Sequence, residues 1–578
     1  MTRRRRIVVG LVIGTAVLLI GRGAALAYAD FAWYRALGAA PLWREHARDV
    51  VTIQGLSLLC AGLFAFANLS ALRRSIVSLA LPRRMGNVEF GEAVPGRYLD
   101  RAVITLSLAI AAVMSLVIPA WQQLALARVG PVFGERDPFY QMDLGFYIAW
   151  LPLESSAYTW ALILLLLVSA VVIGLYALTP SLRWQSGAFH VSVYVRRHLA
   201  ALASLLLLIM AWSYRLDGFN LLVNGSGPGG MFSYVDHQWL IPAYLSLSVG
   251  TVAAAALVLA SGWTGQVRLS FFTISGVLIF SVALDLILPS VVRRMASRGG
   301  AEVHERPYAA TREAFTRRAY SPVATSGAIA ALPGEVTRFA AFADSARIRA
   351  FVASERPRIL VYPGADGAAL ALNAPHVPAP TLGTGLRRLA HAWAEQRLDL
   401  AWSSLPANAR IVTRRDVATR AAALAPIFTQ ASSVPALFFA DTLTWVVEIY
   451  SASTRYPLSE HNAVAGKDWS YFRHAGTMLI NSHTGRTFII PPASLDPVAA
   501  AWRTRFPEMF RAGSRDILDA LTPAPTIVAP PRAQGTPSDS AFRSDVYRLY
   551  SRMRAALAAG DLKTFAALWD SLGGVLGR

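Results

Sequence analysis

Apolar residues are concentrated in the first 290 positions of the chain. They form seven long stretches, each close to the 20 or so mainly apolar residues that a helix needs to cross a bilayer. The stretches cover roughly 7–28, 50–70, 102–120, 157–178, 199–216, 241–262 and 270–290. This pattern predicts an α-helical membrane domain of about seven transmembrane helices over residues 1–290.

The rest of the chain shows shorter patterns, which predict a mixed α+β domain over residues 291–522. Turn residues separate pairs of β-like segments, as in hairpins. Three hairpins are predicted, pairing 358–362 with 368–372, 436–439 with 444–449, and 477–481 with 486–490. Helices are predicted at 382–401, 414–427 and 496–511. A proline-rich linker over 523–540 and a helical hairpin over 541–578 complete the predicted organisation.

The distribution of arginine predicts how the membrane domain is oriented. With the N-terminus inside, the inner segments hold fourteen arginines and the outer loops hold six. Because cytoplasmic loops are enriched in basic residues, we expect a cytoplasmic N-terminus. Seven spans then place the α+β domain outside the cytoplasm, at the inner membrane of a bacterial cell. Three arginines that follow the last span argue mildly against this orientation: Arg293, Arg294 and Arg298.

The first stretch is predicted to stay in the protein as a membrane helix. Its basic start resembles that of a signal peptide, but Ala25 and Ala27 form only a faint cleavage site. The aromatic residues between Tyr28 and Tyr34 are typical of a helix leaving the membrane at its interface.

Apart from Arg215 at the very end of the fifth stretch, two charged residues fall within the predicted spans, Arg22 in the first and Asp285 in the seventh. Both helices run in the same direction, and the two charges lie at similar depth, so an intramembrane ion pair between them is one hypothesis. The alternative is that each side chain extends separately to the membrane surface. A coupled proton or ion pathway is a third interpretation, although mid-membrane acidic and histidine residues are few.

Two loops between the spans have distinctive compositions. Residues 121–156 interleave aromatic residues with prolines and acids, which suits a segment lying at the membrane interface. The loop 217–240 contains a glycine-rich run, Asn224 to Gly230, that favours a flexible or re-entrant turn. It lacks the lysine of a phosphate-binding loop.

The first of these loops carries a family resemblance. The segment resembles a signature of uncharacterised protein family 0182, a family of large bacterial multi-pass membrane proteins. The signature residues are Asp137, Pro138, Asp143, Gly145, Phe146, Tyr147 and Pro152. Further similar blocks follow in the same order, at Tyr234-Val235-Asp236, Glu305-Arg306-Pro307-Tyr308, Ala409-Arg410-Ile411-Val412 with Arg414, Arg415 and Arg420, Trp445 to Tyr450, and Asp496-Pro497.

The resemblance implies a seven-helix membrane part and a large extracytoplasmic domain, but it supplies no reaction. The chain also departs from the family pattern. Members are typically much longer, the stretch between Tyr320 and Leu382 is shortened, and the acidic tail of many members is missing. The resemblance therefore implies a shortened member, and it carries over no function seated in those parts.

Composition agrees with a membrane protein that has a basic surface. Charged residues make up 16% of the chain, against roughly 25% in a typical soluble domain. The formal charge of +20 suits anionic lipid headgroups or acidic envelope polymers, or it reflects an arginine-rich composition. Nucleic acid is not expected as a partner outside the cytoplasm. The single cysteine, Cys60, excludes an intramolecular disulfide and a cysteine-based zinc site.

Motifs for catalysis and cofactor binding are weak. The chain has neither a His-Glu-x-x-His zinc motif nor a Gly-x-Ser-x-Gly nucleophile elbow, and no cofactor is predicted. His461, His474 and His483 cluster in sequence, but solvated or core-edge roles are favoured over metal binding. Asp441 and Glu448 could meet as paired carboxylates, although a turn aspartate and a strand glutamate paired with an arginine is the simpler interpretation.

Three functions follow as hypotheses. The favoured one is a non-enzymatic, membrane-anchored scaffold or binding module for an envelope protein or an anionic membrane lipid. The second is a transporter or lipid-moving protein, and the third an extracytoplasmic enzyme with an unrecognised site. The sequence leaves the oligomeric state open.

Overall fold

The computed structural model describes most of both halves of the chain. The described residues are 3–77, 96–117, 121–177, 182–185, 188–287, 301–320, 359–431, 436–439, 442–464, 467–492 and 494–513, together with a few shorter pieces at 84–89 and 549–569.

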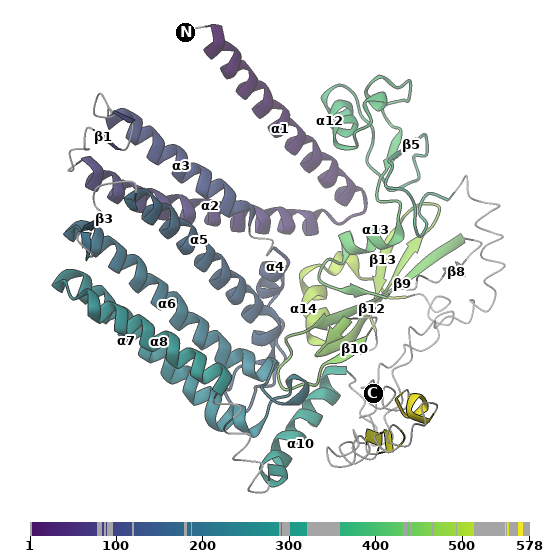
Figure 1. Cartoon of the computed structure of the whole chain (residues 1–578). Coiled ribbons are helices and arrows are strands. Elements are labelled where there is room, and N and C mark those ends of the chain that lie inside the picture. Colours follow the sequence, from purple (N-terminus) through teal and green to yellow (C-terminus); the bar gives the residue numbers. More distant parts are fainter. Residues whose placement is uncertain are drawn as a thin grey trace.

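Long helices form the N-terminal half (Figure 1). They are α1 (Arg3–Ala36), α2 (Ala40–Val77), α3 (Gly96–Leu116), α5 (Leu151–Ala177), α6 (Val193–Val223) and α7 (Ile241–Thr264). All of them except α1 lie side by side in a layer, and α1 diverges from α2. Among the described residues, six helical segments are long and apolar enough to cross a membrane. The seventh predicted span corresponds to α8 (Val267–Val282), which has 16 residues and continues into a π-helical turn, η4 (Ala283–Ile287). The predicted fold class is therefore confirmed, and the described residues contain six helices long enough to span a membrane and one shorter apolar helix.

Three π-helical turns lie at the ends of apolar helices: two of them precede α5 and α7, and one follows α8. They are η1 (Phe146–Trp150), η3 (Asp236–Leu240) and η4. Each ends two residues before a proline, at Pro152, Pro242 and Pro289. A proline has no N–H for the carbonyl four residues earlier, and its ring crowds that carbonyl, so a wider turn relieves the conflict. In η1 and η3 the N–H groups of Leu151 and Ile241 donate to the carbonyls five residues earlier.

The C-terminal half contains a five-stranded antiparallel sheet. Its main path is β13 (Thr487–Ile490), β12 (Tyr471–Asn481), β9 (Thr442–Ser453) and β7 (Thr429–Gln430), and β8 (Ala436–Phe439) also pairs with β9. Helices α13 (Val417–Leu424) and α14 (Pro497–Arg505) lie beside the sheet (Figure 1). β10 (Asn462–Val464) pairs with β11 (Lys467–Trp469) in a separate ribbon. The mixed α+β class of this half is confirmed.

Two of the three predicted hairpins are confirmed and one is wrong. The β8–β9 and β12–β13 pairs form as predicted. The predicted pairing of 358–362 with 368–372 does not occur, since β5 (Leu370–Leu372) pairs instead with β6 (Arg410–Val412). The reason lies in Leu360 and Val361, whose N–H groups both donate to the carbonyl of Ser482. That segment is therefore tied to the turn of the third hairpin.

The predicted helices form, but over shorter ranges. Residues 382–401 contain α12 (Leu386–Ala394) and a 3₁₀ turn, η6 (Leu398–Trp402). The helix predicted at 496–511 is α14 followed by η7 (Pro507–Met509). The linker over 523–540 lies outside the described residues. In the described pieces near the C-terminus, Met553 and Leu568 are buried in one small cluster, and the division into domains stays a prediction.

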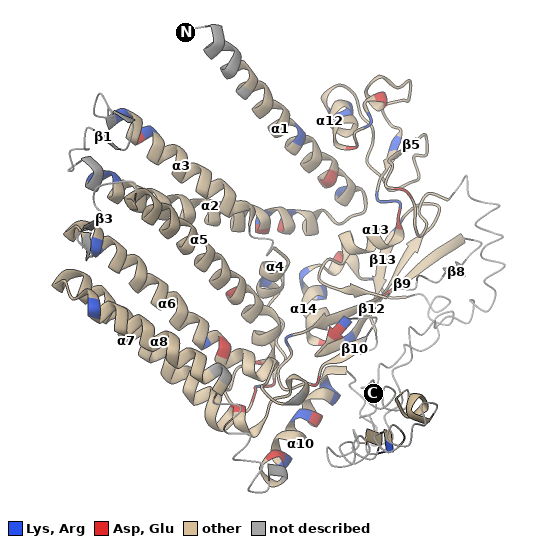
Figure 2. Ribbon diagram, viewed as in Figure 1, with Lys and Arg blue, Asp and Glu red and all other residues tan. Residues whose placement is uncertain are grey.

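One hydrophobic core joins the helix ends to the α/β half. It contains Trp33 of α1, Leu222 of α6 and Trp445 of β9. Hydrogen bonds cross the same junction, from the Tyr34 hydroxyl to the carbonyl of Ala423 at 2.8 Å and from the Leu458 N–H to the carbonyl of Leu222 at 2.7 Å. Helix α10 (Ala301–Tyr320) also lies at this end of the bundle (Figure 1). Many basic residues of the helices lie at their opposite ends (Figure 2).

Candidate functional site

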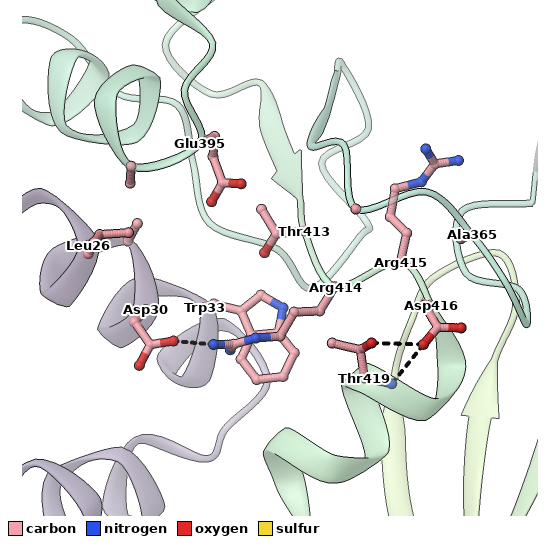
Figure 3. Close-up of a pocket in the computed structure, with 13 residues that line it drawn as sticks. Leu26, Asp30, Trp33, Ala365, Glu395, Thr413, Arg414, Arg415, Asp416 and Thr419 are labelled. Atoms are coloured by element: carbon pink, nitrogen blue, oxygen red, sulfur yellow. Dashed lines mark hydrogen bonds and ion pairs between the residues drawn. The ribbon is translucent and has the colours of Figure 1, made fainter. Parts of the chain in front are cut away.

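A cavity of about 410 Å³ lies where the C-terminal end of α1 meets the α/β half. From α1 it is lined by Leu26, Ala29, Asp30 and Trp33. From the α/β half it is lined by Ala365, Gly367, Ala394, Glu395, Thr413, Arg414, Arg415, Asp416 and Thr419 (Figure 3). The cavity therefore combines residues of a candidate membrane span with charged residues of the other half.

Arg414 is the central side chain of the cavity. Its guanidinium lies 4.2 Å from the centre of the Trp33 ring and forms an ion pair with Asp30 (Figure 3). The Asp30 carboxylate also accepts a hydrogen bond from the Trp43 indole at 2.8 Å. Among the described residues, Nη1 of Arg414 has no hydrogen-bond partner although the atom is buried. Arg414 thus brings a positive charge and guanidinium N–H donors to the lining of the cavity.

The backbone at Arg414 has an unusual conformation, with a φ of 49°. This left-handed geometry costs a non-glycine residue about 1 kcal/mol or more, so its surroundings must hold it in place. The buried side chain of Arg420 does so by donating to the carbonyls of Thr413 and Arg414, both at 3.1 Å, and to that of Gly485 at 2.9 Å. Burial, with a further contribution from Arg414, lowers the pKa of Arg420 to about 10.

Asp416 fixes the other side of the same turn. It caps α13 by accepting hydrogen bonds from the N–H and the hydroxyl of Thr419, both at 2.8 Å, and it also accepts from the N–H of Gly364 at 2.8 Å. Burial acts to raise the pKa of Asp416, but these hydrogen bonds outweigh it and the pKa is lowered. Arg414 is thus placed by a helix cap on one side and a buried arginine on the other.

The charges around the cavity are mixed. Arg414 and Arg415 are balanced by three carboxylates, those of Asp30, Glu395 and Asp416. Arg415 is already paired with Asp366 at 3.1 Å. Burial raises the pKa of Glu395, and the nearby charge of Arg414 lowers it in part. The cavity thus offers a donor at Arg414 and an acceptor at Glu395.

The family-signature loop has a structural role. Asp137 is fully buried and accepts hydrogen bonds from the N–H groups of Phe139, Tyr140 and Met142 and from the hydroxyl of Tyr147, at 2.5 to 3.0 Å. Asp143 accepts from the N–H groups of Phe133, Gly134 and Gly145 at 2.8 to 3.2 Å. Pro138 begins the turn around Asp137, Phe146 starts η1, and Pro152 lies in the first turn of α5.

A second buried aspartate repeats this arrangement. Asp236 accepts hydrogen bonds from the N–H of Ser226, and from the N–H and the hydroxyl of Ser233, at 2.7 to 3.2 Å. It starts η3 just before α7, as the Asp137 loop precedes η1 and α5. The glycine-rich run is therefore packed against Asp236. The sequence analysis indicated Asp236 only as part of the family resemblance.

The structure does not test the predicted ion pair between Arg22 and Asp285. Arg22 has another partner, since its Nη1 donates to the carbonyl of Trp393 at 2.9 Å. Asp285 belongs to η4, but its side chain lies outside the described residues. Helices α1 and α8 are drawn on opposite sides of the helical layer (Figure 1). The ion pair stays a prediction.

The other sequence candidates are separated. Glu448 bonds to His474 at 2.5 Å and to the Thr477 hydroxyl at 3.1 Å, so its expected arginine partner is wrong. Asp441 lies outside the described residues. His461 lies 3.6 Å from Asp468, and His483 contacts Ser482. Within the part of the chain that the structure describes, no three metal-binding side chains come together.

Sequence reasoning missed Arg414 as a site residue. It noted Arg414, Arg415 and Arg420 only as part of the family resemblance, and it assigned Trp33 to an aromatic interface belt. The available signal was three arginines within seven positions around Asp416.

Comparison with known proteins places this chain in a family. A family model described as "Uncharacterised protein family (UPF0182)" matches residues 7–325 and 378–521. The chain belongs to this family. The unmatched residues between the two parts fall in the stretch that the sequence indicated as shortened. No solved structure matches the chain.

The chain is similar to several proteins described as UPF0182 proteins. One from Desulforamulus reducens is 26% identical over 56% of this chain and 37% of its own length. One from Salinibacter ruber is 28% identical over 55% of this chain and 34% of its length. One from Mycobacterium tuberculosis strain H37Ra is 25% identical over 55% of this chain and 33% of its length. The chain thus spans about a third of the length of these curated relatives.

Proposed function

We propose that this protein is a non-enzymatic, membrane-anchored binding module whose cavity holds the headgroup of a membrane phospholipid. The observation that carries this proposal is the guanidinium side chain of Arg414, which lines a cavity beside a candidate membrane span and has one buried nitrogen without a hydrogen-bond partner among the described residues. A phosphate is a suitable acceptor, because it forms strong charge-assisted hydrogen bonds with a guanidinium.

The position of the cavity along α1 supports a lipid as the ligand. Leu26 and Ala29 belong to the apolar part of the helix, whereas Asp30 and Trp33 lie towards its end, where polar and aromatic residues mark a membrane interface. A lipid could keep its acyl chains beside the apolar residues and place its headgroup against Arg414.

The mixed charge of the cavity favours a particular headgroup. Three carboxylates line it beside the two arginines, so a purely anionic headgroup would meet repulsion as well as attraction. Phosphatidylethanolamine carries a phosphate for Arg414 and an ammonium group for Glu395. We therefore propose it as a better ligand than phosphatidylglycerol, which refines the anionic lipid expected from net charge.

The proposed location is the bacterial inner membrane, with the N-terminus in the cytoplasm and the α/β half outside. Two observations support it. The α/β half packs at the helix ends that carry Trp33 and Leu222. The opposite ends carry many of the basic residues (Figure 2), as expected for a cytoplasmic side. Among them, Arg73 and Arg74 lie near the C-terminal end of α2, and Arg196 and Arg197 lie near the N-terminal end of α6. An envelope protein as a further partner stays a hypothesis, as does transport.

The test is lipid retention by the purified full-length protein. Protein reconstituted with equal amounts of phosphatidylethanolamine, phosphatidylglycerol and phosphatidylcholine is released into the gas phase, and bound lipids are counted by native mass spectrometry. We expect preferential retention of phosphatidylethanolamine, lost in Arg414→Gln. The matched control is Arg503→Gln, an equal charge change at an exposed position of α14. Equal retention of all three lipids, unaffected by Arg414→Gln, would contradict the proposal.

A further inference from the structure

Helix α12 belongs to the α/β half but packs along α1. The Trp393 ring lies so close to Gly21 that a Cβ at that glycine would come within 2.6 Å of it. Ala394 is buried in one cluster with Ala25 and Ala29. The Arg22 guanidinium also donates to the carbonyl of Trp393. Contact therefore extends along α1 from Gly21 to Ala29, inside the candidate span Ile13–Ala36.

The position of this contact along α1 shows that it lies within the apolar part of the helix. Gly21 lies nine residues before Asp30, or about 13.5 Å along the helix axis at about 1.5 Å per residue. Because α1 diverges from α2 (Figure 1), this length is an upper bound on the depth of Gly21 below Asp30. Interfacial amphipathic helices are typically buried about 5–10 Å into the boundary between headgroups and acyl chains.

The sequence of α12 has the pattern of such a helix. Leu386, Leu389, Ala390 and Trp393 follow the spacing of a single helix face. Ala390 and Trp393 pack against α1, while Leu386 and Leu389 continue the stripe with side chains 84% and 43% exposed.

The following 3₁₀ turn extends this apolar surface. Within η6, Leu398 is 55% and Trp402 is 79% exposed. The Arg388 guanidinium donates to the carbonyls of Gly383, Ser403 and Leu405 at 2.6 to 3.2 Å, and it thereby ties α12 to the chain that follows η6. Hydrogen bonds from Arg388 thus connect α12 and η6 into one structural unit.

We infer that the segment Leu386–Trp402 inserts into the membrane leaflet on the side of the α/β half, beside α1. Leu386, Leu389, Leu398 and Trp402 contact the lipid at the level of the glycerol groups and upper acyl chains. The α/β half is then attached to the bilayer at a second place, separate from its junction with the helix ends. This inference does not depend on which ligand, if any, occupies the cavity.

The test measures membrane depth in the full-length protein, reconstituted into vesicles of phosphatidylethanolamine and phosphatidylglycerol. Cys60→Ser removes the single native cysteine, and a spin label is attached to Leu386→Cys, Leu389→Cys or Trp402→Cys. The control is Asn373→Cys, an exposed position just after β5. Collisions of each label with oxygen, which concentrates in lipid, are compared with collisions with a water-soluble nickel chelate.

We expect oxygen collisions to dominate at the three test positions and nickel collisions to dominate at Asn373→Cys. Nickel dominance at all four positions would overturn the inference and place the segment in water. Low collision rates with both reagents at the test positions would also overturn it, since that result indicates cover by protein. Circular dichroism and size-exclusion profiles matching those of Cys60→Ser confirm that each variant is folded.

Discussion

The guanidinium of Arg414 lies over the ring of Trp33, 4.2 Å from its centre. This contact joins the α/β half to α1 through a cation–π interaction, a type worth about 0.5–2 kcal/mol depending on how far the groups are removed from water. The ion pair between Arg414 and Asp30 acts at the same place. One arginine thus contributes both to the junction of the two halves and to the cavity.

Replacing Arg414 should lower stability more than replacing its neighbour. Arg414→Gln removes the contacts to Trp33 and Asp30 and leaves a half-buried carboxylate with less compensation, at a cost of about 1–3 kcal/mol. Arg415→Gln removes a pair with Asp366, whose side chain is 70% exposed, and a hydrogen bond to the carbonyl of Leu360 at 3.1 Å, and it should cost about 1 kcal/mol. Thermal unfolding in mild detergent compares the two variants. Equal midpoints would argue against a special role for Arg414.

Gly145 in the signature loop should not tolerate a methyl group. A Cβ there would lie 1.9 Å from the carbonyl oxygen of Pro131, so the backbone must move. We expect Gly145→Ala to cost about 2 kcal/mol or more. Gly174→Ala in α5 is the matched control, because no atom would lie within 4 Å of its Cβ, and its effect should stay below about 1 kcal/mol. A Gly145→Ala protein as stable as the control would refute this account of the loop.

Asp137 should matter more for stability than Asp143. Asp137→Ala leaves three N–H groups and the Tyr147 hydroxyl without their acceptor in a fully buried place, at a cost on the order of 3 kcal/mol or more. Asp143 is partly accessible, so water can replace its carboxylate and the cost should be about 1 kcal/mol. Limited proteolysis and thermal unfolding should rank the variants in that order, and the reverse ranking would contradict the assignment.

Acidification should weaken the protein around α12. Burial lowers the pKa of His391 to about 4, against 6.5 when exposed. The unfolded chain therefore binds a proton that the folded one rejects, so this contribution to stability is complete above pH 6.5 and declines as the pH falls towards 4. The full loss corresponds to about 3 kcal/mol at most.

His391→Gln tests this pH dependence. It removes the titrating group beside the Tyr28 ring, whose centre lies 5.3 Å from that of His391, and should flatten the decline in unfolding midpoint between pH 7 and pH 5. The same slope in both proteins would show that another group is responsible.

Sequence alone predicted most of the long apolar helices, because long apolar stretches are a direct signal of membrane helices. It also predicted β8–β9 and β12–β13, whose strands lie close in sequence on either side of short turns. It failed for β5, whose partner β6 lies some 40 residues away and is selected by packing that no local pattern encodes.

The candidate site was harder to predict for the same reason. Asp30, Glu395 and Arg414 come together only through tertiary structure. The left-handed backbone at Arg414 also could not be predicted, because such a conformation is usually indicated by a glycine. Here it is held instead by a hydrogen bond from Arg420, six residues away. Local motifs therefore indicated the membrane class but not the cavity.

The most direct test of headgroup binding is to locate a bound lipid on the protein. Phosphatidylethanolamine with a photoreactive group on its acyl chain near the glycerol, which keeps the phosphate and the ammonium group intact, is added to the reconstituted full-length protein and irradiated, and the attachment sites are mapped by peptide mass spectrometry. The account predicts attachment on α1 around Leu26 and Ala29, greatly reduced in Arg414→Gln and unchanged in Arg503→Gln. Attachment confined to other segments, or equal labelling in both variants, would contradict it.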